Sequence, residues 1–148
     1  MSRSLLLSLA LVLSLLGVAD SWYLYESAIT DTALTCDIGA GLDGCNVVAQ
    51  SPYSQFFGLP LALYGVGFFW LMFAVTAAQF FIPSRRLQLP YLGLSMFGAA
   101  ASLVFVYIQF FLIKALCIYC LLSAAITFAL LGIAWRLRRP SKAPLLDS

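Results

Sequence analysis

The sequence contains no histidine, and only 9% of its 148 residues are charged. Without an imidazole the chain cannot form a Ser-His-Asp hydrolytic triad, and Leu121 after Cys120 excludes the C-x-x-C-H motif of haem attachment. Soluble domains carry roughly 25% charged residues, so the low charge also excludes that class. The net charge of +2 is small and gives no indication of a nucleic-acid partner.

Hydrophobic residues make up 63% of the chain and form runs long enough to cross a bilayer, which takes about 20 residues. Residues 91–135 contain one charge, Lys114, and as a single helix they would extend ~67 Å, about twice the membrane thickness. The chain must therefore turn back near Lys114. We predict one integral membrane domain over residues 1–148, with spans at about 4–25, 57–82, 90–113 and 115–135 and an outer loop at 26–56.

The predicted fold class is an all-α membrane protein: a four-transmembrane-helix bundle whose long outer loop carries a short surface half-helix. The half-helix is expected from Ser51-Pro52, because serine before proline is typical of a helix start. The first run has two interpretations. Small residues at 17–19 would suit cleavage of a signal peptide, but the run continues through Trp22, Tyr23 and Tyr25, which are typical of a helix end at the membrane interface. We favour a retained transmembrane helix.

The basic residues predict the orientation of the four spans. The N-terminus, the connection between the second and third spans and the C-terminal tail would share one side of the membrane. Seven of the eight basic residues belong to these segments, so the positive-inside rule assigns that side to the cytoplasm. We therefore expect a multi-pass protein of the cell inner (cytoplasmic) membrane with cytoplasmic termini. The seven residues are Arg3, Arg85, Arg86, Arg136, Arg138, Arg139 and Lys142.

This topology predicts that all four cysteines lie on the outer side, where disulfides are permitted. Cys36 and Cys45 flank a glycine-containing stretch of the polar loop, and Cys117 and Cys120 form a C-x-x-C pair at the start of the last span. Two such pairs can pass electrons by thiolate attack on a disulfide. A helix N-terminus would favour the thiolate of Cys117, and the ammonium group of Lys114 would act in the same direction if it lies close.

Other uses of the four sulfurs remain open at this point. The loop pair alone could be a structural disulfide. A C-x-x-C disulfide closes a small, strained ring that stabilises little, so a structural role suits it less well. A four-cysteine zinc site is possible by count, although oxidation would compete with it outside the cytoplasm. A non-catalytic membrane protein is therefore the rival to a redox relay.

The order of Cys36, Cys45, Ser51, Phe57-Gly58 and Cys117-Ile118-Tyr119-Cys120 resembles the vitamin K epoxide reductase family, specifically its stand-alone bacterial members. The resemblance implies a four-helix bundle around a quinone of the ubiquinone or menaquinone type. It also implies that Cys120 faces the quinone, that Cys117 exchanges with Cys45, and that Cys36 completes the loop disulfide. Ser51 matches a serine near the quinone, but it could equally be a helix cap before Pro52. Phe57 is expected in the wall of the quinone pocket.

The resemblance implies a membrane thiol–disulfide oxidoreductase with Cys117, Cys120, Cys36 and Cys45 as its catalytic residues. It would oxidise a separate thioredoxin-like (DsbA-like) protein outside the cytoplasm and reduce a quinone, supporting disulfide formation in exported proteins. The alternative is the reverse direction, a quinone or vitamin K epoxide reductase, because redox potentials set the direction. The quinone-contacting asparagine and tyrosine of the animal enzyme are replaced here by Ala74 and Ala124, which disfavours the epoxide as a substrate.

Overall fold

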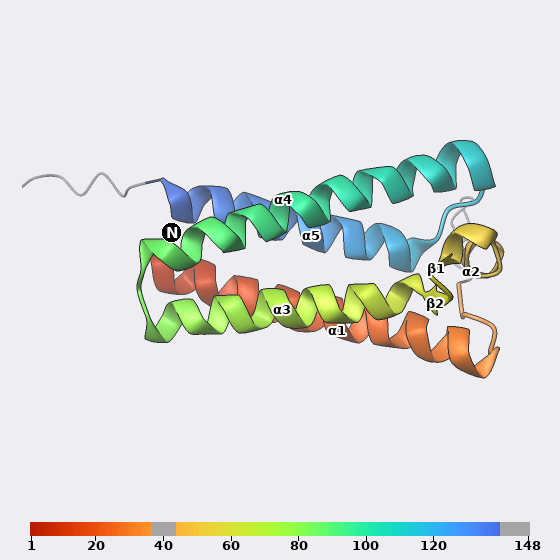
Figure 1. Ribbon diagram of the computed structural model, residues 1–148, viewed down its shortest axis with the longest axis horizontal. Coiled ribbons are helices and arrows are strands. Elements are labelled where there is room, and N and C mark those ends of the chain that lie inside the picture. Colours follow the sequence, from red (N-terminus) through yellow and green to blue (C-terminus); the bar gives the residue numbers. More distant parts are fainter. Residues whose placement is uncertain (37–43, 140–148) are drawn as a thin grey trace, which may run out of the picture.

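Four long helices lie side by side and form an antiparallel bundle (Figure 1). The structure, a computed structural model, describes residues 1–36 and 44–139. Each of the four is long and apolar enough to cross a membrane, and the third does so over Arg85–Ile113. This confirms the predicted four-helix membrane bundle. The helices are α1 (Arg3–Thr30), α3 (Leu61–Phe81), α4 (Arg85–Tyr107) and α5 (Ile118–Arg138).

The bundle has two different ends (Figure 1). We call one the basic end, because α1 and α4 begin there and α5 finishes there with Arg136 and Arg138. Serine side chains cap two of these helices: the hydroxyls of Ser2 and Ser84 accept hydrogen bonds from the backbone N–H groups of Leu5 and Arg86. We call the opposite end the cysteine end, because it holds Cys36, Cys45, Cys117 and Cys120.

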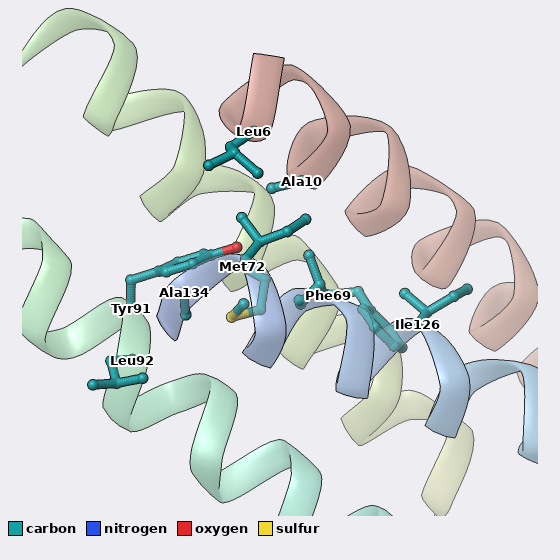
Figure 2. Packing of buried hydrophobic residues seen from close by; sticks show 10 residues of the cluster. Leu6, Ala10, Phe69, Met72, Tyr91, Leu92, Ile126 and Ala134 are labelled. Atoms are coloured by element: carbon teal, nitrogen blue, oxygen red, sulfur yellow. The ribbon is translucent and has the colours of Figure 1, made fainter. Parts of the chain in front are cut away.

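The main hydrophobic core lies in the half of the bundle nearer the basic end. Figure 2 shows how its side chains pack. All four long helices contribute to it, and Met72 and Leu130 are fully buried. Small residues allow the helices to approach closely, as expected for membrane helices. A Cβ atom at Gly17 would meet the ring of Phe69, and one at Gly98 would meet the ring of Phe68. The core residues drawn in Figure 2 are Leu6, Ala10, Phe69, Met72, Tyr91, Leu92, Ile126, Leu130, Ile133 and Ala134.

The loop at the cysteine end is built from several short elements. They are α2 (Cys45–Ala49), the 3-10 turn η1 (Pro52–Ser54), and a hairpin of β1 (Gln55–Phe56) and β2 (Leu59–Pro60). At the place where the half-helix was expected, after Ser51-Pro52, the structure has the three-residue turn η1 and then the hairpin, and α2 precedes that place. Neither α2 nor the hairpin was predicted. Its two-residue turn has positive φ angles at both central residues, 51° at Phe57 and 75° at Gly58, which explains why a glycine is present.

The last two spans are joined by a tight reversal of the chain. The six-residue π-helix η2 (Ile108–Ile113) extends α4, and Lys114 then takes a left-handed conformation with φ of 58°. The backbone carbonyl of Gln109 closes the turn by accepting hydrogen bonds from the N–H groups of Lys114 and Ala115. The predicted reversal near Lys114 is confirmed, and neither glycine nor proline makes it.

The helix boundaries differ from those predicted. The first helix continues to Thr30 instead of ending near Tyr25, because polar residues such as Glu26 prolong it beyond the apolar run. The second begins at Leu61 instead of Phe57, since the hairpin precedes it. The predicted glycine-containing link falls mostly on residues 37–43 and the loose tail on 140–148, both outside the described residues.

Candidate active site

The structure brings the four cysteines together in one cluster. Cys36, Cys45 and Cys117 are buried and pack with Leu34, and Cys120 lies against the same group from the first turn of α5. Cys36 and Cys45 form a disulfide with a Cα–Cα distance of 6.1 Å, whereas Cys117 and Cys120 are both thiols. One oxidised and one reduced pair therefore pack against each other, as sulfur exchange requires.

Cys117 occupies the N-cap position of α5, directly before the first helical residue. A hydrogen bond from the thiol of Cys120 lowers the pKa of Cys117 below its usual value of 9.0. Hydrogen bonds from the backbone N–H groups of Cys120 and Tyr119 lower it further, while burial and the charge of Asp20 oppose the shift. Cys117 is thus the sulfur whose thiolate the helix start favours. The condition set for Lys114 is not met: it is exposed and is not among the groups that shift this pKa.

Gln109 lies between the chain reversal and the C-x-x-C pair. Its side chain is 1% exposed, and its Oε1 atom accepts a hydrogen bond of 3.2 Å from the backbone N–H of Cys117. Its amide group also hydrogen-bonds with the thiol of Cys120. The same residue therefore closes the turn through its backbone and contacts both cysteines through its side chain.

The loop reaches the C-x-x-C segment through a close backbone contact at Gly44. The N–H of Gly44 donates a 3.1 Å hydrogen bond to the carbonyl of Leu116, which places Cys45 beside Cys117. A Cβ atom at position 44 would lie 2.7 Å from the Cβ of Ala115 and 3.0 Å from backbone atoms of Leu116. Only glycine allows this approach without displacing the backbone.

Three side chains hold the loop on the other side of the disulfide. Asn46 accepts a 2.8 Å hydrogen bond from the N–H of Leu34 and donates one of 3.2 Å to its carbonyl. Tyr119, inside the C-x-x-C motif, donates a 2.6 Å hydrogen bond to the carbonyl of Thr35, and the hydroxyl of Tyr23 accepts from its N–H at 3.4 Å. The rings of Tyr23 and Tyr119 are 5.1 Å apart. These contacts fix the residue that immediately precedes Cys36.

A cavity of about 910 Å³ lies between the helices beneath α2 and η1. Its volume is within the range of sites that bind drug-sized ligands, roughly 300–1,000 Å³. Cys45, Cys117 and Cys120 all border it, and its walls include the aromatic side chains of Phe68 and Phe105. A largely apolar cavity bordered by three cysteine sulfurs is therefore large enough for an apolar ligand of drug-like size.

The two other predicted quinone contacts have different positions. Ser51 lines the cavity, and its hydroxyl donates a 2.7 Å hydrogen bond back to the carbonyl of Val48 instead of capping η1. Phe57 is 88% exposed at the tip of the hairpin and is not among the residues that line the cavity. The structure therefore brings Ser51 together with the cysteines, but not Phe57, which lies in the turn of the hairpin.

Sequence reasoning missed three residues of this site. Gln109 and Ser123 line the cavity, and Asp20 is buried behind Ser123, whose hydroxyl donates a hydrogen bond to it. Asp20 lies within α1. A carboxylate inside an apolar run was the available signal, because such residues are costly in a membrane and are often functional.

Comparison with known proteins identifies the family. The sequence profile of the vitamin K epoxide reductase family matches residues 8–135, most of the chain. The chain belongs to this family. It is also similar to the thiol-disulfide oxidoreductase LTO1 of Arabidopsis thaliana, with 31% identity over 118 residues that cover 75% of this chain. The match spans about 31% of the length of that relative. Family membership confirms the resemblance seen in the cysteine pattern.

Proposed function

We propose that this protein is a membrane thiol–disulfide oxidoreductase that oxidises a dithiol protein and transfers the electrons to a quinone. One observation carries the proposal: a loop disulfide, a C-x-x-C dithiol and an apolar cavity are contiguous. Family membership and the similarity to the thiol-disulfide oxidoreductase of Arabidopsis support disulfide chemistry. The proposed partner is a separate thioredoxin-like (DsbA-like) protein, whose two thiols would reduce the Cys36–Cys45 disulfide.

The proposed cycle moves two electrons from the loop pair to the C-x-x-C pair. With the loop reduced and Cys117–Cys120 oxidised, the Cys45 thiolate attacks Cys117, and Cys120 leaves as a thiolate. Cys36 then attacks Cys45, which restores the loop disulfide and releases Cys117. The result is the redox state of the structure, a loop disulfide beside two thiols. The lowered pKa of Cys117 makes it a good leaving group in the second step.

The cavity provides the site for the terminal oxidant. A bound quinone supplies the capacity to accept two electrons and two protons, which is what oxidation of one dithiol releases. Cys120, Ser51 and the aromatic walls would hold its ring, and the absence of charged side chains from most of the lining suits its apolar tail. The hydrogen bonds made by Gln109 keep both sulfurs at the edge of this cavity.

We propose that the basic end faces the cytoplasm and that the cysteine end faces the outer compartment. The basic end carries Arg3, Arg85, Arg86, Arg136 and Arg138, in agreement with the positive-inside rule. An outer location would keep the Cys36–Cys45 disulfide away from cytoplasmic reductants. Alkylation of single engineered cysteines in intact cells tests this orientation. Preferential labelling of a basic-end cysteine from outside the cell would contradict it.

The rival functions make different predictions. A four-cysteine metal site needs four thiolates, but Cys36 and Cys45 are bonded to each other in this structure. Metal analysis of the fully reduced protein tests that alternative. A reductase working in the opposite direction would use the same residues, so the measured potentials of the two pairs decide between them.

Replacement of single cysteines tests the proposed function. Protein reconstituted with ubiquinone or menaquinone should oxidise a reduced thioredoxin-like protein and form quinol. Cys120→Ala should reduce turnover to background, because the C-x-x-C pair could no longer form a disulfide, whereas Ser4→Ala at the basic end should have no effect. A Cys45–Cys117 mixed disulfide should accumulate in Cys36→Ala and Cys120→Ala. Full quinol formation by Cys120→Ala would overturn the proposal.

A further inference from the structure

A carboxylic acid inside the bundle has no role in the cycle described so far. Asp20 lies within α1 and is only 8% exposed. A charged aspartate within a membrane helix is energetically costly unless a partner compensates its charge. Within residues 1–36 and 44–139, Asp20 forms no ion pair with a basic side chain that would offset this cost. Its hydrogen-bond partner there is the hydroxyl of Ser123 on α5, which donates to Oδ2.

Ser123 links this carboxyl group to the redox site. It follows Cys120 by three residues, so the two side chains lie on the same face of α5, one turn apart. Ser123, Cys117 and Cys120 all line the cavity, while Asp20 lies behind Ser123. The carboxyl group of Asp20 is also close enough to Cys117 and Cys120 to interact with them electrostatically. A hydroxyl therefore connects the cavity to a buried group that can hold a proton.

The titratable neighbours of Asp20 are few. From α5 they are Cys117, Cys120 and Tyr119. The other helix that packs on α1 is α3, and its titratable side chain is Tyr64, which is 41% exposed and bonded to the carbonyl of Phe56. On α1 itself, the nearest are Tyr23, Tyr25 and Glu26. Among these neighbours, the thiols of Cys117 and Cys120 are the groups that lose protons during the proposed reaction.

We propose that Asp20 and Ser123 form a proton relay for the C-x-x-C pair. Oxidation of two thiols to a disulfide releases two electrons and two protons, and this inference rests on the proposed function, in which a bound quinone accepts all four. The thiol proton of Cys120 passes to Ser123 while the hydroxyl proton of Ser123 passes to Asp20. The carboxylic acid would then return this proton through Ser123 to the quinone that accepts the two electrons in the cavity, while the other proton leaves Cys117 without the relay. Asp20 ends as a carboxylate, so the step is balanced.

Asp20→Asn is the sharpest test, because asparagine keeps the size and can still accept the hydrogen bond from Ser123, but cannot carry the proton. Quinol formation should fall about 100-fold, the lower range for loss of general acid–base catalysis. The pH profile of this rate should also lose the inflection that the titration of the Asp20 carboxyl group produces. Ser123→Ala should show the same change in the pH profile. Glu26→Gln, an exposed carboxylate on the same helix, is the matched control and should behave as the unsubstituted protein.

Two further measurements distinguish a proton relay from a purely structural role of Asp20. Neither of them depends on quinol formation. Transfer between the loop pair and the C-x-x-C pair, measured without quinone, should be unchanged in Asp20→Asn. The infrared carboxylate band of Asp20 should shift when the C-x-x-C pair is oxidised without quinone, and this band should be missing in Asp20→Asn.

The possible outcomes are distinct. An unchanged pH profile and rate in Asp20→Asn, or equal slowing of both transfers, would overturn the relay. Failure of the unsubstituted protein to form quinol would instead overturn the proposed function. In that case the infrared band still decides whether Asp20 responds to the redox state of the cysteines.

Discussion

The two ends of the bundle are held together in different ways. At the basic end, regular helices pack through apolar side chains such as Met72 and Leu130, both fully buried. At the cysteine end, the backbone leaves the helical pattern, and individual hydrogen bonds from Gly44, Asn46 and Tyr119 hold the loop. Many weak apolar contacts give the basic end its stability. A few specific contacts position the sulfurs and can be broken one at a time.

The largest expected effect concerns the stability of the basic end. Leu130→Ala removes a fully buried side chain and should lower the free energy of unfolding by about 2–5 kcal/mol. Leu122→Ala, on the same helix but 48% exposed, should change it by less than about 0.5 kcal/mol. Denaturation in detergent measures both. The folded fraction of Leu130→Ala should retain its turnover. A loss of turnover without a loss of stability would contradict the view that the basic end provides stability and the cysteine end positions the sulfurs.

At the contact of Gly44 with Leu116, we expect a loss of turnover with little loss of stability. Gly44→Val places a side chain against Ala115 and Leu116, so Cys45 should move away from Cys117. Turnover should fall about 100-fold, as for a 1 Å displacement of a reacting group, with little change in the unfolding of the bundle. Gly67→Val is the control, since nothing lies within 4 Å of a Cβ atom there. Normal formation of the Cys45–Cys117 mixed disulfide in Gly44→Val would refute this role.

A smaller effect is expected at the tyrosine that holds Thr35. Tyr119→Phe keeps the ring but removes the 2.6 Å hydrogen bond to the carbonyl of Thr35, a loss of about 1 kcal/mol, or roughly fivefold in loop docking. The rate of reduction of the Cys36–Cys45 disulfide by a small dithiol should rise, because the loop is less firmly held. Tyr64→Phe, which loses a similar bond at the hairpin, should leave that rate unchanged.

The smallest change concerns the protonation of one sulfur. In a background with Cys36 and Cys45 replaced by alanine, Cys120→Ala should raise the pKa of Cys117, because it removes the hydrogen bond that lowers it. Cys117 would then become a thiolate only at higher pH. Cys120→Ser retains an O–H donor and should keep the pKa lower than Cys120→Ala does. Titration of the ultraviolet absorbance of the thiolate measures the pKa of Cys117 in both variants. If Cys120→Ala and Cys120→Ser give the same pKa, the helix start alone sets it.

The fold was more predictable from the sequence than the site. Long apolar runs and the single charge at Lys114 are local signals, and they predicted the four spans and the reversal. The cysteine pattern predicted the family. Gln109 carries no such local signal, and the carboxylate of Asp20 in an apolar run indicates only that it is unusual. The roles of both depend on contacts with distant segments. Phe57 looked like a pocket residue, but the local turn places it at the exposed tip of the hairpin.

By itself, the sequence determined that this chain is a four-helix membrane protein with two cysteine pairs, because hydrophobic length and residue spacing are properties of the chain. Only the tertiary structure decided how the pairs meet. The absence of a side chain at Gly44 matters because Leu116 lies against it, and Asp20 matters because α5 brings Ser123 to α1. Contacts between distant segments arise from helix packing, so a linear pattern does not reveal them.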